Sequence, residues 1–308
     1  MDIRQREQLT AFCPSVRWDV DMASYSTFRT GGRVEAMVEP VDTAALAQLL
    51  RWLQENRIPW RVIGGGSNIL VTSKYHQGVF IKLSGAVKDI APVTAETEGE
   101  GREYFISAGC SLPALVTWCV KNGLSGLEFM AGIPGSVGGA IRMNAGAFGH
   151  SIGEVLTAVR FLTEAGDIKE VAGEKVEFRY RQTRLPGEPA TRLLITGGVF
   201  RLQRAEQVAL QASYRQIIAR RRQNQPHVYG SAGSFFKNPA GDFAGRLIEQ
   251  AGLKGLTFGK AMVSPVHANF IVNTGGAVPE DIIGLMQEVR STVQRRSGVL
   301  LEPEVHIF

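Results

Sequence analysis

The segment "AGIPGSVGGAIRMNAGAFG", residues 131–149, is the stretch of this chain on which the choice of fold depends. Glycine recurs throughout it, and Arg142 is its only charged residue. Because glycine loses more conformational freedom on folding than any other residue, a soluble protein concentrates it where a side chain would not fit. The segment therefore predicts tight turns, chain crossings, or a ligand held against bare peptide groups.

A second glycine-rich segment, "GGGSNILV" (residues 64–71), directly follows a predicted strand at residues 60–63. Together the two segments offer unshielded backbone N–H groups, which can bind phosphate oxygens without any lysine. Ser67, Asn68, Ser136 and Asn144 add polar side chains. Tight turns between strands would explain one such run, but two runs in one predicted domain favour a cofactor that carries a diphosphate.

The bulk composition is that of a globular protein. The chain has 308 residues, of which 44% are hydrophobic and 20% charged. This length allows two domains or three, and the composition excludes a disordered chain. The net charge of +5 suits an anionic ligand. The arginine clusters at residues 220–222 and 295–296 fall near predicted helix ends. This position favours solvated helix termini over a nucleic-acid-binding surface.

The cysteine count and the hydropathy predict a cytoplasmic protein. The three cysteines are far apart and form no CxxC pair, as expected in a reducing compartment. The polar N-terminus does not resemble a signal peptide, and no apolar run reaches the roughly 18 residues of a membrane span. The five histidines are not paired at metal-ligand spacings, so we predict no metal site.

Periodicity and capping residues predict helices at residues 42–57, 111–123, 205–222, 242–252 and 279–296. Strands are predicted between them, including a hairpin at residues 154–163 and 168–172 and a final strand at the C-terminus. Strands and helices mix without regular βαβ alternation. The sequence therefore predicts the α+β class.

The ordered motifs "FRTGG", "GGGSNILV", "AGIPGSVGGAIRMNAGAFG", "YRQT", "GSFFKNP", "HANFIVN" and "LEPEV" give the chain a family resemblance. It resembles the UDP-N-acetylenolpyruvoylglucosamine reductase (MurB) family, from about Tyr25 to Phe308. The glycine segments alone resemble the wider vanillyl-alcohol-oxidase (PCMH) type of flavoprotein. "YRQT", "GSFFKNP" and "EPEV" narrow the resemblance to the reductase.

The resemblance implies a fold and a reaction. It implies an FAD-binding region at residues 1–204, made of two α+β subdomains and joined by the C-terminal strand 299–308, and a smaller α+β substrate-binding domain at residues 205–298. The reaction would be NADPH-dependent reduction of UDP-N-acetylglucosamine enolpyruvate to UDP-N-acetylmuramate through non-covalent FAD, for peptidoglycan. The alternatives are another FAD-dependent oxidase or dehydrogenase of this fold group, and a nucleotide-sugar-binding protein without catalysis.

Three catalytic residues are implied by the resemblance. Arg181 matches the arginine that holds the substrate carboxylate, a task that suits the charged, forked guanidinium. Ser234 matches the proton donor, and Glu304 matches a glutamate near the reacting carbons that orients Arg181 or acts as an acid. The residues alone do not distinguish Arg181 from Arg179 and Arg184, and they allow Ser234 and Glu304 to be ordinary loop and strand residues.

The resemblance also implies ligand contacts. The glycine segments would bind FAD through Gly64, Gly65, Gly66, Ser67, Asn68, Ile69, Leu70, Ala131, Gly132, Ile133, Pro134, Gly135, Ser136, Gly138, Gly139, Asn144, Gly146 and Ala147. Lys237 and Asn238 would contact the substrate, with Gln225 and His267 as weaker candidates. We expect Gly138→Val or Gly139→Val to yield protein without flavin.

The stretch between Arg181 and Ser234 departs from part of the family. It has room for only a helix and a short connection, so it resembles the type that lacks a tyrosine-bearing loop over the substrate. We expect the segment at residues 220–233 to close the site instead. A monomer is favoured.

Overall fold

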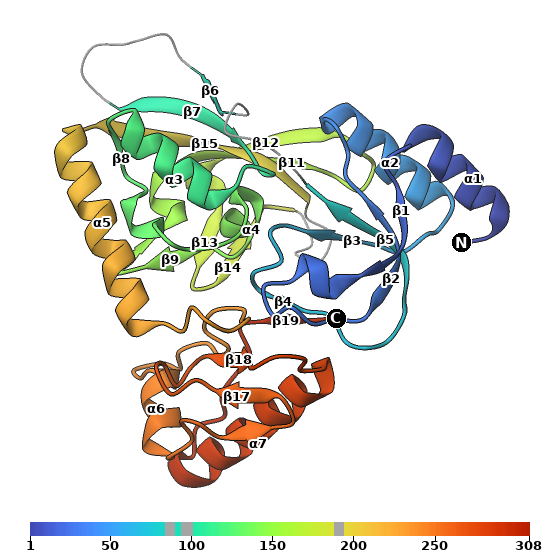
Figure 1. Ribbon diagram of the computed structural model, residues 1–308. Helices are drawn as coiled ribbons and strands as arrows, with labels where there is room; N and C mark the ends of the chain where they lie inside the picture. The colour runs from blue at the N-terminus through green and yellow to red at the C-terminus, as the bar shows by residue number, and fades with distance from the viewer. Residues whose placement is uncertain (84–89, 94–100, 188–193) are drawn as a thin grey trace. The chain divides into compact units, whose positions relative to one another are not determined.

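The computed structural model describes residues 1–83, 90–93, 101–187 and 194–308 (Figure 1). The chain forms two compact units. Unit 1 comprises Met1–Trp18, Ala36–Gly65 and Gln77–Ala219, and unit 2 comprises Asp19–Glu35, Gly66–His76 and Arg220–Phe308. Unit 2 is therefore assembled from three stretches that are far apart in the sequence.

These units differ from the predicted division at residues 204/205 and 298/299. Most of helix α5 (Gln207–Asn224) belongs to unit 1, because Tyr214, Ile217 and Ile218 pack against a core of that unit. The C-terminal stretch belongs to unit 2, because Leu301 and Val305 are buried in the unit 2 core. Burial of apolar side chains, which sequence patterns do not assign to a particular partner, sets both boundaries.

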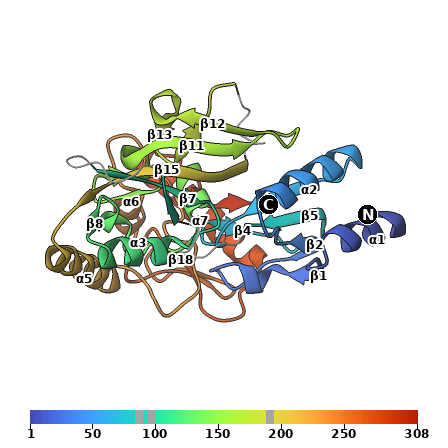
Figure 2. The same ribbon diagram turned by 90° about the horizontal axis from the view of Figure 1, so that it is seen from above.

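One core of unit 1 lies under helices α1 (Ile3–Phe12) and α2 (Thr43–Glu55), which lie side by side (Figures 1 and 2). The ring of Phe12 packs edge-on against Trp52, with 5.3 Å between ring centroids. Helix α2 begins as predicted, where the Asp42 side chain accepts a hydrogen bond from the Ala45 N–H at 2.7 Å. A four-stranded sheet has the order β1 (Arg17–Asp21), β2 (Arg33–Val38), β5 (His76–Lys82) and β3 (Trp60–Ile63), with β3 parallel to β5.

The second core of unit 1 lies at a six-stranded sheet. Its strands are β12 (Ile168–Ala172), β11 (Leu156–Leu162), β15 (Leu194–Arg204), β7 (Arg102–Ser107) and β6 (Ile90–Pro92) in that order, with β8 (Leu124–Ser125) paired to β15. The predicted hairpin is the antiparallel pair β11 and β12. Helices α3 (Leu112–Lys121) and α4 (Val137–Arg142) contribute buried residues to this core.

Shorter elements connect these parts of unit 1. They are the 3-10 helices η3 (Glu128–Met130), η4 (Ile152–Val155) and η5 (Gly173–Lys175), the small hairpin β9 (Gly146–Ala147) and β10 (His150–Ser151), and the hairpin β13 (Glu177–Arg179) and β14 (Gln182–Arg184). The last of these hairpins carries Arg181.

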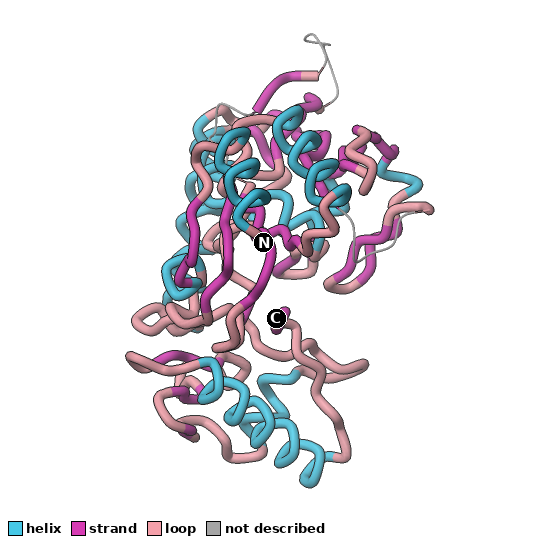
Figure 3. Tube along the Cα trace, turned by 90° about the vertical axis from the view of Figure 1, so that its right-hand side faces the viewer, coloured by secondary structure: helices cyan, strands magenta, loops and turns pink. Residues whose placement is uncertain are grey.

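Unit 2 contains one long helix, α7 (Pro279–Ser297), and shorter elements joined by loops (Figure 3). The shorter elements are η1 (Met22–Tyr25), β4 (Ile69–Leu70), α6 (Ala244–Gln250), β16 (Thr257–Phe258), β17 (Ala261–Val263), β18 (Ile271–Asn273) and β19 (His306–Ile307). Its core combines Phe28 and Leu70 from the early stretches with Phe235, Phe236 and buried residues of α7. Strand β19 runs parallel to β4, which closes the unit with the last residues of the chain.

The predicted α+β class is confirmed by this mixture of helices and mainly antiparallel sheets. None of the described helices combines the length and apolar character that a membrane crossing requires.

Candidate active site

The two glycine-rich segments meet in unit 1, and their contact explains the first two glycines. A Cβ atom at Gly65 would lie 2.7 Å from the Cα of Gly135, and one at Gly64 would lie 2.3 Å from Ser136 Oγ. Neither distance leaves room for a methyl group. Gly64 and Gly65 are therefore required by a chain crossing, one of the alternatives that the sequence left open.

Part of the second segment forms the short helix α4, which the sequence analysis did not predict. Ser136 caps it, because its Oγ accepts a hydrogen bond from the Gly139 N–H at 3.3 Å. The Val137 N–H donates to the Cys110 carbonyl at 2.9 Å, and the Gly138 N–H donates to the Ala108 carbonyl at 2.8 Å. These three N–H groups are thus used within the protein, so fewer donors are open to a ligand than the glycine content suggests.

Other N–H groups of the same segment are not used within the described protein. In the described part of the chain, the N–H groups of Gly132, Gly135 and Ser136 donate no hydrogen bond. Gly132 and Gly139 are exposed, and a Cβ at Gly139 would meet only Ser136 Oγ, at 3.5 Å. This bare backbone surface fits a ligand with phosphate oxygens, which need N–H donors and close approach.

Thr196 adds a buried polar atom close to this surface. Its Oγ1 has no hydrogen-bond partner among the described residues, although the side chain is buried on β15. Its carbonyl accepts the Ala108 N–H at 2.9 Å, and Ala108 in turn accepts the Gly138 N–H. Because a buried hydroxyl without a partner is destabilising, this atom also fits a site that a polar ligand completes.

Gly146 and Ala147 form the small hairpin β9–β10 rather than an open loop. A Cβ at Gly146 would lie 2.4 Å from the His150 carbonyl oxygen, so the hairpin itself requires this glycine. Ala131 is fully buried, whereas Ile133 is half-buried and Pro134 exposed. Of these predicted cofactor residues, Ile133, Pro134 and Ala147 present side-chain surface.

Arg181 lies in the turn of hairpin β13–β14. Arg179 pairs with Gln182 in the register, which leaves Tyr180 and Arg181 as a two-residue turn in which Arg181 has φ 56°. The guanidinium carbon of Arg181 lies 4.9 Å from the centroid of the Tyr180 ring. Arg179 and Arg184 both pair with Glu177. The three arginines therefore differ in their place on the hairpin: Arg179 and Arg184 lie on its strands and Arg181 lies in its turn.

Unit 2 brings Asn68, Glu304 and the backbone beside Ser234 together. The Glu304 N–H donates to the Phe235 carbonyl at 2.8 Å, and Asn68 Nδ2 donates to the Glu304 carbonyl at 3.2 Å. The His306 N–H donates back to the Asn68 carbonyl at 3.1 Å. Asn68 of the first glycine segment therefore holds both Glu304 and the start of strand β19, which follows it.

The remaining residues of the first segment are divided between surface and core. Gly66 has φ +67°, and its Cβ would lie 1.8 Å from the Tyr25 carbonyl oxygen. Ser67 and Ile69 are half-buried, whereas the Leu70 side chain is fully buried in the unit 2 core. The side chain of Leu70 is thus a core side chain, and any cofactor contact there would come from its backbone.

Asn269 is a site residue that the sequence analysis missed. Its carbonyl accepts the Phe235 N–H at 2.7 Å, and its side chain both accepts the Phe236 N–H at 3.0 Å and donates to the Phe236 carbonyl at 2.8 Å. These bonds fix the "GSFFKNP" segment directly after Ser234. A buried asparagine inside the apolar "HANFIVN" stretch was the available signal, because a buried amide needs partners.

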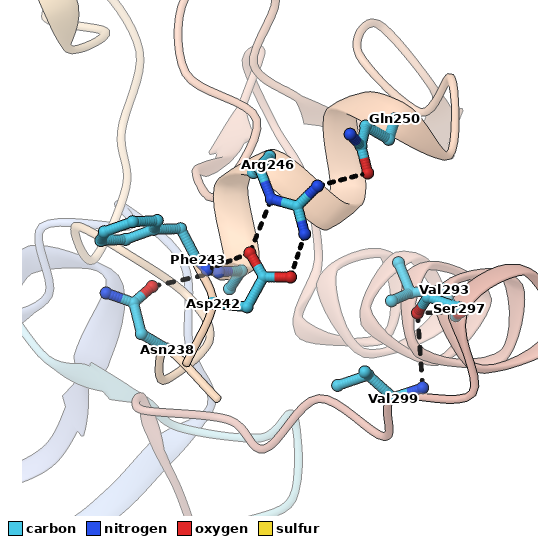
Figure 4. Close-up of polar contacts among 9 residues, drawn as sticks. Asn238, Asp242, Phe243, Arg246, Gln250, Val293, Ser297 and Val299 are labelled. Atoms are coloured by element: carbon cyan, nitrogen blue, oxygen red, sulfur yellow. Dashed lines mark hydrogen bonds and ion pairs between the residues drawn. The ribbon is translucent and has the colours of Figure 1, made fainter. Parts of the chain in front are cut away.

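The predicted substrate contacts of unit 2 lie around this segment. Lys237 Nζ lies 3.4 Å from Glu302 Oε2, and Asn238 Oδ1 accepts the Ala244 N–H at 3.1 Å (Figure 4). His267 Nδ1 accepts the Asn269 N–H at 3.2 Å, and burial lowers the pKa of its imidazole, so His267 is neutral at pH 7. Gln225 directly follows helix α5, and its N–H donates to the Arg221 carbonyl at 2.9 Å. In the described part of the chain it forms no hydrogen bond with the other candidate substrate residues.

Known proteins match both parts of the chain. The family "FAD binding domain" matches residues 34–172, and the family "UDP-N-acetylenolpyruvoylglucosamine reductase, C-terminal domain" matches residues 225–308. UDP-N-acetylenolpyruvoylglucosamine reductase 2 of Symbiobacterium thermophilum is 42% identical over 92% of this chain and 89% of its own length. The corresponding reductase of Heliobacterium modesticaldum is 40% identical over 93% of this chain and 88% of its own.

A solved structure agrees with these matches. The crystal structure of the reductase from Thermus caldophilus superposes with a TM-score of 0.78 at 33% identity, covering 95% of this chain and 98% of that chain. The similarity therefore extends over both units and is not confined to the glycine segments.

Proposed function

Because the chain belongs to the UDP-N-acetylenolpyruvoylglucosamine reductase family, we propose that it reduces UDP-N-acetylglucosamine enolpyruvate to UDP-N-acetylmuramate with NADPH, for peptidoglycan synthesis. The near full-length match at about 40% identity carries this proposal. Bound FAD would relay the hydride from NADPH to the enolpyruvyl double bond.

The residues of unit 1 would hold the FAD non-covalently. The open N–H groups of Gly132, Gly135 and Ser136 would face the diphosphate, and the exposed surface of Gly139 would allow its close approach. Thr196 Oγ1 would gain the partner that it lacks in the described protein. The non-covalent assignment stays a prediction, which denaturation and filtration of the yellow protein would test.

We assign the catalytic roles residue by residue. Arg181 would bind the substrate carboxylate and stabilise the negative charge that develops beside it. Ser234 would donate a proton to the adjacent carbon, and in the described structure its hydroxyl has no protein partner that would compete. Glu304 would act close to Ser234, since the Glu304 N–H binds the carbonyl of Phe235, the residue after Ser234. Lys237, Asn238, Gln225 and His267 are proposed substrate contacts.

Anaerobic stopped-flow absorbance at the flavin band tests the proposal. NADPH should bleach the flavin in the wild type and in Ser234→Ala alike. UDP-N-acetylglucosamine enolpyruvate should then restore the colour rapidly in the wild type and at least about a hundredfold more slowly in the variant, since a positioned proton donor is worth 10²–10⁴-fold. A wild-type flavin that only oxygen reoxidises would instead indicate an oxidase of the same fold group.

We propose a cytoplasmic location for the enzyme. All three cysteines are free and buried, which agrees with a reducing, cytoplasmic location. We also propose a monomer, which light scattering after gel filtration would test.

We propose that residues 220–233 close the substrate site. Gly230 is bridged to Asn273, so the exposed stretch His227–Tyr229 is the part to follow by protease protection with substrate.

A further inference from the structure

The hairpin that carries Arg181 is attached through both strands, to helix α4 and to Asn144, two residues beyond the end of that helix. Thr183 Oγ1 donates to the Ile141 carbonyl, and Arg142 Nη1 donates to the Thr183 carbonyl at 3.3 Å. On the other strand, Asn144 Nδ2 donates to the Arg179 carbonyl at 3.1 Å. Arg179 and Thr183 each stand two positions from Arg181, so the bonds flank the turn on both sides.

Both polar atoms of the Asn144 side chain take part in this attachment. The residue is buried, and its Oδ1 accepts the Gly153 N–H at 3.1 Å while its Nδ2 binds the hairpin. Its φ of +39° is a backbone conformation that asparagine tolerates better than most residues. Gly153 also packs against the Phe178 ring of the hairpin, where a Cβ would lie 2.6 Å from a ring carbon. The position thus serves the hairpin rather than a ligand.

The hairpin that carries Arg181 has little stability of its own. A two-stranded hairpin is marginally stable alone, and β13 and β14 pair only with each other. The Tyr180 side chain under the guanidinium is itself exposed. The bonds to Ile141, Arg142 and Asn144 therefore contribute to fixing the position of the turn.

We infer that Asn144 and Thr183 are positioning residues for Arg181, and that Asn144 is not the cofactor ligand that its place in the glycine segment suggested. The inference rests on the proposed function for the meaning of Arg181. The glycine segment thereby has two tasks: its first half presents bare backbone, and its second half anchors the arginine hairpin. A misplacement of about 1 Å at a binding group can cost on the order of a hundredfold in rate.

Two variants test this inference: one removes the bond from the Thr183 hydroxyl of strand β14, and the other removes the bond from Asn144 to strand β13. Thr183→Val removes the hydroxyl but keeps the shape, and the Ile141 carbonyl retains the Asn144 N–H as a donor. Asn144→Asp keeps the acceptor for Gly153 and removes the donor to Arg179. Thr157→Val is the matched control, because its hydroxyl also binds a backbone carbonyl, that of Val199 at 3.4 Å, which belongs to strand β15 and not to the hairpin.

Stopped-flow kinetics on the FAD-loaded variants should separate the two half-reactions. We expect Thr183→Val and Asn144→Asp to raise the KM for the enolpyruvyl substrate about tenfold or more, with FAD affinity and flavin reduction by NADPH within about twofold of wild type. In an Arg181→Ala background, Thr183→Val should add no further loss. Equal slowing of both half-reactions, or a full additional loss in that background, would overturn the inference.

Hydrogen exchange distinguishes this inference from the proposed function. Amides 180–182 should exchange about tenfold faster or more in both variants than in the wild type or Thr157→Val. Unchanged exchange at these amides would sink the inference whatever the activity. If exchange rises but the wild-type flavin is never reoxidised by the substrate, the attachment stands and the proposed function fails.

Discussion

The two glycine-rich segments look alike in sequence and differ in what requires their glycines. At residues 64–66 each glycine faces another part of the protein: Ser136, Gly135 and the Tyr25 carbonyl. At residues 131–149 the requirement is mixed, since Gly138 and Gly146 pack against protein while a Cβ at Gly139 would have open space. Glycine content therefore indicates close backbone approach, but it does not say whether the neighbour is a ligand or the chain itself.

The largest effect should come from Gly66→Ala. The new Cβ would lie 1.8 Å from the Tyr25 carbonyl oxygen, at a φ of +67° that side chains disfavour. We expect a loss of about 3 kcal/mol or more in the free energy of unfolding, measured by urea denaturation of the FAD-free protein. A stable Gly66→Ala protein that simply lacks flavin would show that this glycine serves the cofactor after all.

Gly139→Val should leave the stability of the FAD-free protein nearly unchanged and weaken FAD binding. The FAD-free protein should keep its stability within about 1 kcal/mol, because valine and glycine are both weak helix formers and the site is open. FAD affinity, measured by quenching of flavin fluorescence, should fall about a hundredfold or more, since a side chain would occupy the proposed phosphate surface. Flavin binding at wild-type affinity would remove Gly139 from the cofactor site.

Gly138→Ala is the control for that experiment. A Cβ there would lie 2.7 Å from the Ala108 Cβ, so the FAD-free protein should lose about 1–3 kcal/mol of unfolding free energy. Gly138→Val would therefore lose flavin because the new side chain disturbs the packing against Ala108. Only the variant at Gly139 tests the proposed phosphate-binding surface.

The smallest effect is expected at Thr196. Thr196→Val removes a buried hydroxyl that has no described partner, so the FAD-free protein should gain about 1 kcal/mol in thermal or urea unfolding. FAD should bind about fivefold more weakly if the hydroxyl donates to it, the equivalent of about 1 kcal/mol. Lower stability of the FAD-free variant would show that the hydroxyl already has a partner.

The helices with clear periodicity were predictable from the sequence. Leucines on one face and Asp42 as a cap predicted α2, and Pro279 with Gly298 marks the ends of α7. Helix α1 was missed because only Leu9 is buried, although Asp2 and Gln5 form a capping box. Helix α4 was missed because glycine is a poor helix former, and packing against Ala108 and Cys110 overrides that propensity.

The kind of site was predictable from the sequence, but the hydrogen-bond partners of its residues were not. Motif order brought Ser234 and Glu304 forward as candidates, and the pairing through Phe235 agrees with a shared location. The role of Asn144 was not predictable, because its partners Gly153 and Arg179 are not adjacent to it in the sequence and only the fold brings them together. Asn269 was missed for the same reason: its partners are Phe235 and Phe236.

The way unit 2 closes has a consequence for biosynthesis. Phe28 and Leu70 leave the ribosome early, yet their core partners Phe235 and Leu301 arrive near the end of translation. Residues 301–308 complete the pairing, since the Phe308 N–H donates to the Leu70 carbonyl at 3.0 Å and its carbonyl accepts the Thr72 N–H. Such long-range contacts form slowly. Unit 2 can therefore finish folding only after residues 301–308 have left the ribosome, and until then Phe28 and Leu70 lack their core partners and can be bound by chaperones.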